Sequence, residues 1–267
     1  MALWRTNLKV ALAILLSVLI CFLAVPSSAT PADNRTGQVT VFWGRHKDEG
    51  SLREACDSDT YTTVIISFLN VSGHSRYDLD LSGHPLTGIG NDIKHCQHVG
   101  IAVSLSITFD GSKNTLPTNQ SALNLSDHIW NAYLGSSGKG HLDVLARELA
   151  KRSIRGKTLH LTATPRCNFP GSLTTGIFER IHVRYYGDHA GNCDNWDDWA
   201  DGYPSSRIFL GLPASPEAVK EGYLYPKSLY YGILPVAQMS ANYGGVMIWD
   251  RFYDRASSYS SCVNRWA

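Results

Sequence analysis

Three aspartates that follow apolar runs are the first candidates for chemistry. Asp110, Asp188 and Asp250 come after segments with the composition of buried β-strands. Two carboxyl groups roughly 5–9.5 Å apart can act as a general acid and as a base or nucleophile. The sequence places no two of these aspartates at such a separation. Surface acids in salt bridges are therefore the alternative interpretation, and the pattern identifies no catalytic residue.

A second candidate is a cationic segment. Lys151–Lys157 holds four Lys or Arg residues in seven positions, and Arg152 and Arg155 are among them. A guanidinium group can bind a carboxylate through two parallel hydrogen bonds. Cations also gather at the C-terminal ends of helices, where the helix dipole favours them. The segment therefore indicates either a contact for an acidic partner or a solvated helix end.

The charge balance argues against nucleic acid as a partner. The 267 residues carry a net charge of +1, and no basic block is present. Removal of Arg5 and Lys9, which lie in the segment discussed next, changes the net charge from +1 to −1. The histidines show no metal-ligand spacing with acids or cysteines. We therefore expect neither a metal nor a cofactor.

The first residues are typical of a secretory signal peptide. Two cations precede an apolar run over Val10–Val25, and Pro26–Ala29 offers small residues for cleavage. A membrane anchor is the alternative, but the run is shorter than the ~20 residues that a spanning helix needs. We predict cleavage after Ala29, secretion, and a single domain over residues 30–267.

Five cysteines follow the signal peptide, and in a secreted chain they favour disulfides over metal sites. Sequence alone does not fix the pairing. We favour Cys56 with Cys96 and Cys167 with Cys193, which leaves Cys262 unpaired. Four N-x-S/T sequons are candidate glycosylation sites on the surface. They are Asn34, Asn70, Asn119 and Asn124.

Seven segments have the composition of buried strands, near residues 40, 66, 104, 161, 184, 210 and 247. They alternate with helical patterns such as Ile89–His98 and Ser121–Leu134, which predicts a parallel α/β sheet. In a barrel of parallel strands, functional residues lie at the carboxyl ends of the strands. A closed barrel has eight strands. The missing strand is expected at 135–140, between two consecutive helical patterns.

Local signals predict further details. Ser51 is a candidate cap for a short helix over Glu49–Cys56. A loop with Gly73 and Gly83 is expected after the second strand. The segment Pro226–Ala237 is expected to be mostly helical until Pro235.

Several motifs together carry a resemblance to a known family. They are Val41–Gly44 with Glu49–Leu52, then Gly211–Ala218, and Tyr243–Trp249 with Phe252–Asp254. The chain resembles plant class III chitinases of glycoside hydrolase family 18, from about Val39 to the C-terminus. It looks closest to the cereal xylanase inhibitor proteins, which are chitinase-like and secreted. The resemblance implies a (β/α)8 TIM barrel, here without strand four.

Departures from the family bear on activity. The family signature Asp-Gly-x-Asp-x-Asp-x-Glu on strand four supplies the proton-donating Glu and an Asp that orients the substrate's acetamide. This sequence contains no such stretch. Strand three ends in Ser104–Thr108 instead of the family's Ser-Leu-Gly-Gly, and Arg184 stands where chitinases carry Gln. The resemblance therefore implies a protein that is not an enzyme.

The resemblance also implies binding residues. Trp249 matches the aromatic floor of the family's sugar cleft and Tyr186 a wall residue, which implies a vestigial site for chitooligosaccharides. The alternative is that Trp249 only fills the barrel mouth. Lys151–Lys157 matches the inhibitors' xylanase-binding loop, with Arg155 and Arg152 as candidate contacts. We expect an apoplastic monomer that binds a microbial xylanase in plant defence; an active chitinase and a chitin-binding lectin are the alternatives.

Overall fold

Residues 34–267 form one compact unit. The computed structural model describes residues 36–72, 76–109, 118–129, 160–168, 173, 175–187, 193 and 195–267 of this unit. Some predictions fall outside the described residues and stay predictions. They concern the signal peptide, Asn34, Asp110, the missing strand at 135–140, the segment Lys151–Lys157 with Arg152 and Arg155, and Asp188.

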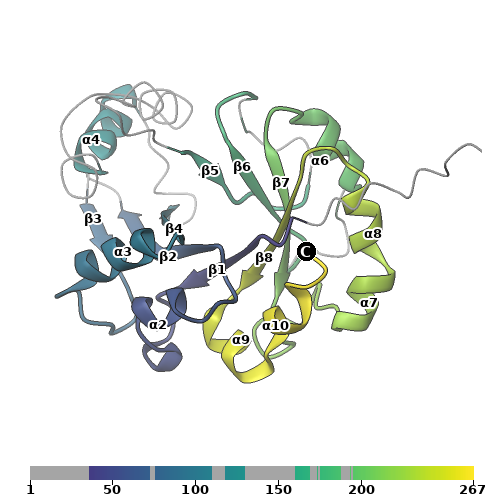
Figure 1. Cartoon of the computed structure of the whole chain (residues 1–267). Helices are drawn as coiled ribbons and strands as arrows, with labels where there is room; N and C mark the ends of the chain where they lie inside the picture. The colour runs from purple at the N-terminus through teal and green to yellow at the C-terminus, as the bar shows by residue number, and fades with distance from the viewer. Residues whose placement is uncertain are drawn as a thin grey trace, which may run out of the picture. The chain divides into compact units, whose positions relative to one another are not determined.

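Seven parallel strands and one antiparallel strand form the central sheet (Figure 1). The parallel strands follow the order β4-β2-β1-β8-β7-β6-β5, so the first and last strands of the chain are neighbours. They are β1 Val39–Trp43, β2 Thr63–Ser72, β4 Ala102–Phe109, β5 Thr162–Ala163, β6 Arg180–Arg184, β7 Arg207–Pro213 and β8 Tyr243–Trp249. The predicted α/β fold and its seven strands are confirmed.

The sequence does not predict strand β3, Arg76–Leu79, where a loop was expected. This strand runs antiparallel to the end of β2, with Leu69 opposite Leu79. Strand β2 is ten residues long, whereas its pairing with β1 ends at Ile66. The second half of β2 therefore has a free edge that β3 occupies. Because β3 is a hairpin addition, β4 is the third strand of the barrel.

Among the described strands, the sheet does not close. Strand β4 pairs only with β2, and β5 pairs only with β6. The two edges still approach each other, because Leu161 before β5 and Ile107 of β4 pack against one cluster that includes Leu125 of α4 (Asn119–Ile129). The described structure thus agrees with a barrel that is open between its third and fifth strands.

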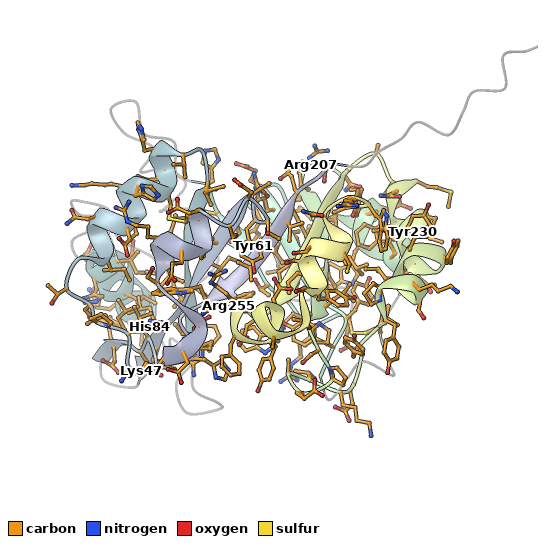
Figure 2. All side chains as sticks on the ribbon, turned by 60° about the horizontal axis from the view of Figure 1, so that its bottom comes forward. Lys47, Tyr61, His84, Arg207, Tyr230 and Arg255 are labelled. Atoms are coloured by element: carbon orange, nitrogen blue, oxygen red, sulfur yellow. A yellow bond between two sulfur atoms is a disulfide. The ribbon has the colours of Figure 1, made fainter. Side chains whose placement is uncertain are left out.

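The remaining helices are η1 Lys47–Glu49, α2 Leu52–Cys56, α3 Ile89–His98, α6 Trp196–Gly202, α7 Pro226–Tyr231, α8 Ile233–Gln238, α9 Arg251–Ser257 and α10 Tyr259–Val263. The segment Pro226–Ala237 is mostly helical, as predicted, but it forms two helices, because Gly232 separates α7 from α8. Pro235 lies in the first turn of α8, where its missing N–H is tolerated. Tyr230 of α7 lies at the surface (Figure 2).

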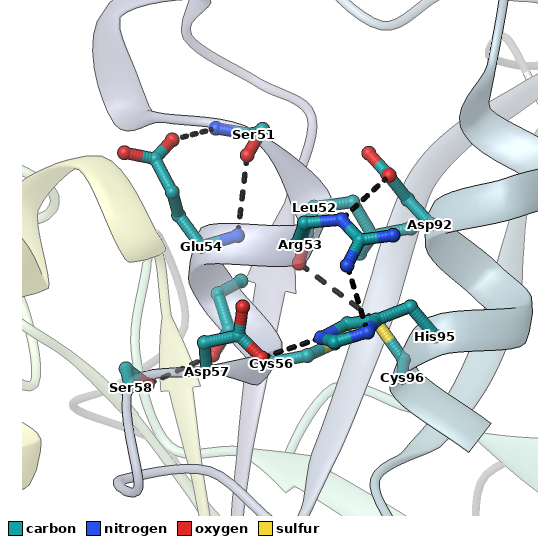
Figure 3. Close-up of a disulfide and its surroundings, with 11 residues drawn as sticks. Ser51, Leu52, Arg53, Glu54, Cys56, Asp57, Ser58, Asp92, His95 and Cys96 are labelled. Atoms are coloured by element: carbon teal, nitrogen blue, oxygen red, sulfur yellow. Dashed lines mark hydrogen bonds and ion pairs between the residues drawn. A yellow bond between two sulfur atoms is a disulfide. The ribbon is translucent and has the colours of Figure 1, made fainter. Parts of the chain in front are cut away.

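The predicted cap and both disulfides are present. Ser51 Oγ accepts a hydrogen bond from the Glu54 N–H at 3.1 Å, and Glu54 Oε2 accepts one from the Ser51 N–H at 2.6 Å (Figure 3). This reciprocal pair begins α2. The Cys56–Cys96 disulfide then joins α2 to α3. A second disulfide joins Cys167 to Cys193, and Cys262 is free and exposed.

The interior of the barrel is apolar at its centre. Phe42, Ile65, Phe209 and Met247 form a buried cluster. At Gly245 the φ angle is +132°, and a Cβ atom would lie 2.1 Å from the Gln38 carbonyl oxygen. Glycine is therefore required where β8 passes the residue before β1. In the part of the chain that the structure describes, no helix has the length and apolar character needed to cross a membrane.

Candidate functional site

A cavity of about 410 Å³ opens at the carboxyl ends of the strands. It lies between the two open edges of the sheet, because residues of both β4 and β5 line it. The described lining residues are Phe42, Ile65, Phe68, Ser104, Leu105, Ser106, Ile107, Thr108, Leu161, Thr162, Ala163, Thr164, Leu173, Phe178, Arg184, Tyr186 and Trp249. The predicted cleft residues Trp249 and Tyr186 are thus brought together.

Aromatic rings form one wall of the cavity. The Trp249 ring lies nearly parallel to that of Phe68, with centroids 6.0 Å apart and planes at 19°. It also lies nearly parallel to Tyr186, at 6.5 Å and 24°. Phe42 meets Trp249 edge-on at 5.1 Å. The apolar surroundings raise the pKa of the Tyr186 phenol above its ordinary value. The sequence did not single out Phe68, which lies in the middle of an apolar strand.

Hydroxyl groups are concentrated on another part of the lining. Ser104, Ser106 and Thr108 come from β4, and Thr162 and Thr164 come from β5 and the residues after it. The signal for this part was the Ser/Thr alternation in β4, which departs from the family's Ser-Leu-Gly-Gly. Short hydroxyl side chains leave room and offer both donors and acceptors. The cavity is therefore amphipathic, as sites for small polar ligands usually are.

Arg184 is the single charged side chain among the described residues that line the cavity. Its Nε atom is buried, and it finds no hydrogen-bond partner among the described atoms. A buried donor without a partner costs free energy that a ligand could recover. Arg184, which stands where chitinases carry Gln, thus lines a cavity that still has a volume of about 410 Å³.

Asp250 is not the surface acid that the sequence suggested. It is only 1% exposed and does not line the cavity, and it caps α9 by accepting a hydrogen bond from the Tyr253 N–H. Its Oδ2 lies 3.6 Å from His46 Nε2. Burial and the neighbouring Glu49 carboxylate raise the pKa of Asp250 to about 6. Two peptide bonds that do not involve proline are cis, Ser67–Phe68 and Trp249–Asp250.

Glu49 is the second buried acid, with 0% exposure. Its Oε1 accepts hydrogen bonds from the N–H groups of Gly44 at 2.9 Å and His46 at 2.7 Å. These bonds hold the turn after β1. Neither Glu49 nor Asp250 lines the cavity, and the described lining contains no carboxyl group. The described residues also contain no group of three or more potential metal ligands.

For three of the four predicted glycosylation sites, the structure shows where the asparagine lies. Asn70 lies half-buried in β2, Asn124 is exposed on α4, and Asn119 begins α4. The Asn124 Oδ1 atom accepts a hydrogen bond from Gln120 Nε2 at 2.9 Å. Glycosylation at all four positions remains a prediction.

Comparison with known proteins places the chain among plant proteins of similar length. It is 47% identical to xylanase inhibitor protein 1 of Triticum aestivum in an alignment of 293 positions that covers 95% of each chain. It is 33% identical to the basic endochitinase of Nicotiana tabacum in an alignment of 297 positions that covers 96% of this chain and 98% of that one. The xylanase and α-amylase inhibitor protein XAIP-II of Scadoxus multiflorus has a similar structure, with a TM-score of 0.76 and 30% identity over 85% of this chain and 97% of that chain.

The length of one alignment bears on the open barrel. The alignment with the wheat protein spans 293 positions, but this chain has 267 residues, so at least 293 − 267 = 26 positions of the relative have no counterpart. This number of unmatched positions is compatible with a barrel that lacks one strand and its adjoining loops. No model of a protein family matches the sequence. From the full-length similarity and the shared barrel, the chain belongs to the plant family of xylanase inhibitor proteins and chitinase-like proteins related to glycoside hydrolase family 18.

Proposed function

We propose that the chain is a secreted, catalytically inactive chitinase-like protein that inhibits a microbial xylanase in plant defence. The observation that carries the loss of activity is the lack of a carboxyl group among the described residues that line the cavity. Glycoside cleavage needs a carboxyl group that protonates the leaving oxygen. Glu49 and Asp250 do not replace it, because both are enclosed and engaged with neighbouring groups.

Inhibition requires a surface that complements a xylanase cleft. Retaining and inverting glycosidases both place two carboxyl groups in that cleft. The four cations of Lys151–Lys157 suit such an acidic target. We propose Arg155 as the main contact and Arg152 as a supporting one. The names of the similar proteins from wheat and Scadoxus support the partner class.

The decisive experiment measures inhibition of a fungal xylanase by the purified protein. Arg155→Ala should weaken inhibition by about 2–5 kcal/mol, because an interfacial cation that pairs with a buried carboxylate is lost. Arg265→Ala removes an equally charged, exposed side chain near the C-terminus and should change nothing. Equal inhibition by both variants would rule out Arg155 as the main contact, and no inhibition by the unmodified protein would rule out this function.

A second candidate function is a chitin-binding lectin, which the stacked rings of Trp249, Phe68 and Tyr186 favour. In that case Trp249→Ala should weaken binding of chitooligosaccharides. The enzyme alternative is tested with a chromogenic chitooligosaccharide. Turnover at the rate of an intact chitinase would contradict the proposed inactivity.

The proposal includes export and cleavage after Ala29, with residues 30–267 as the mature domain. N-terminal sequencing of the protein from the medium of expressing plant cells should begin at Thr30. A chain that stays inside the cells, or that keeps its first 29 residues, would contradict secretion.

A further inference from the structure

We propose that the cavity between β4 and β5 is a binding site for an acidic sugar, a pyranose that carries a carboxylate. Arg184 would bind the carboxylate and Trp249 would pack against the ring. The proposal does not depend on the protein–protein contact proposed above, and it concerns a ligand whose charge differs from that of neutral chitooligosaccharides.

The charge of the cavity lining favours an anionic ligand. Arg184 brings a permanent positive charge into a cavity whose other described lining residues are neutral. Its buried Nε has no hydrogen-bond partner among the described atoms. The buried acid at the end of β8, Asp250, is already engaged with His46 and the start of α9. A bound anion would therefore supply a counter-charge that no described lining residue provides.

The shape of the cavity lining suits a sugar ring. A pyranose has apolar C–H faces and a rim of hydroxyl groups. The nearly parallel rings of Trp249, Phe68 and Tyr186 match the faces. Ser104 and Ser106 offer hydroxyl groups to the rim. A volume of about 410 Å³ lies at the lower end of the ~300–1,000 Å³ of ligand pockets, which suits a small saccharide.

The planar guanidinium group of Arg184 favours a carboxylate over a neutral group. A carboxylate on the ring can accept two parallel hydrogen bonds from an arginine. A neutral sugar would leave the charge of Arg184 without a counter-charge while removing water from it. The cavity should therefore prefer a uronic acid over the corresponding neutral sugar.

The test is isothermal titration of the full mature protein with D-glucuronate, D-glucose and acetate at low salt. Glucuronate should bind at least tenfold more tightly than either control, and added salt should weaken its binding. Equal affinity for glucuronate and glucose would overturn the role of the charge. Equal affinity for glucuronate and acetate would overturn the role of the sugar ring.

Variants locate the binding. Arg184→Gln should weaken glucuronate binding about tenfold or more, and Arg184→Lys should weaken it several-fold, since lysine keeps the charge but loses the two-point contact. Arg207→Gln is the matched control, because Arg207 is an exposed residue at the start of β7 (Figure 2). If Arg184→Gln does not fold, the lysine variant and the comparison of glucuronate, glucose and acetate still test whether Arg184 binds the carboxylate. Identical affinities of the Arg184 and Arg207 variants would refute the assignment, whatever xylanase inhibition shows.

Discussion

Strands β1 and β4 flank the same neighbour, β2, but their surroundings differ. Every side chain of β1 is buried. By contrast, each side chain of Ala102–Thr108 in β4 is at least partly exposed. Strand β1 has β8 on its second side, whereas β4 has no second neighbour among the described strands. The difference shows that burial of a barrel strand depends on its second neighbour as much as on its own apolar residues.

The open side of the barrel carries an energetic cost that the closed side does not. The outer edges of β4 and β5 present backbone groups without strand partners among the described residues. Such edges are tolerated when water reaches them, and they are costly when they are dry. The cavity between them gives water access. The open edges therefore lack strand pairing without leaving dry backbone groups, and they lie beside the proposed ligand site.

The largest effect is expected when the gap is filled. Insertion of a strand-four segment from a full-length relative between residues 130 and 160 should raise the stability of the protein by about 5 kcal/mol, because each edge gains backbone hydrogen bonds worth ~0.5–1.5 kcal/mol each. For a domain of this size the melting temperature should rise by roughly 10–20 °C. A Gly/Ser insert of equal length is the control. Equal melting temperatures for the two inserts would show that β4 and β5 need no partner.

Much of the fold was predictable because local patterns and neighbours agree. The strand near 247 was predicted from Gly-Gly followed by apolar residues, and glycine is required there by the approach of Gln38. The cap at Ser51 was predicted from the helical segment that follows it, and its Oγ accepts a hydrogen bond from the Glu54 N–H. Strand β3 was not predictable, because its formation depends on the free edge of β2 rather than on its own sequence.

The second prediction compares the disulfides of the two sides. Cys56 and Cys96 are 40 residues apart, and Cys167 and Cys193 are 26 apart. Loss of the first by a double Cys→Ala substitution should cost about 4 kcal/mol by loop entropy, and loss of the second about 3.5 kcal/mol. Unfolding in denaturant measures both. A much larger loss for Cys167–Cys193 would show that this crosslink compensates for the open edge at β5.

The cavity was only partly predictable from the sequence. Trp249 and Tyr186 came from the resemblance, and the structure places both on the aromatic wall. Phe68 was missed because nothing in an apolar strand marks the side chain that faces a cavity. The environment of Asp250 was missed because its raised pKa depends on burial and on Glu49, which is 201 positions away in a sequence of 267 residues.

The third prediction concerns the turn after β1, on the closed side. Glu49→Ala should cost about 3 kcal/mol, because the buried N–H groups of Gly44 and His46 both lose their acceptor. Glu54→Ala is the matched control. It removes an exposed acid that caps α2, and it should cost about 1 kcal/mol. Similar losses for the two variants, measured by denaturant unfolding, would mean that Glu49 does not hold the turn.

The last effect is expected from Asp250, and its size depends on pH. Its pKa is raised to about 6 from its ordinary value of 3.8, so the folded chain holds its proton more tightly than the unfolded chain. The stability that this proton gives is present below about pH 4 and is lost as the pH rises through about 6. Asp250→Asn keeps a capping side chain but cannot ionise. The gain of the variant relative to the unmodified protein should therefore grow from about pH 4 and reach at most about 3 kcal/mol at about pH 7. Thermal melts of both proteins across this range measure the difference. If stability depended on pH in the same way in both proteins, Asp250 would be ionised in the folded state across this range, like an exposed acid.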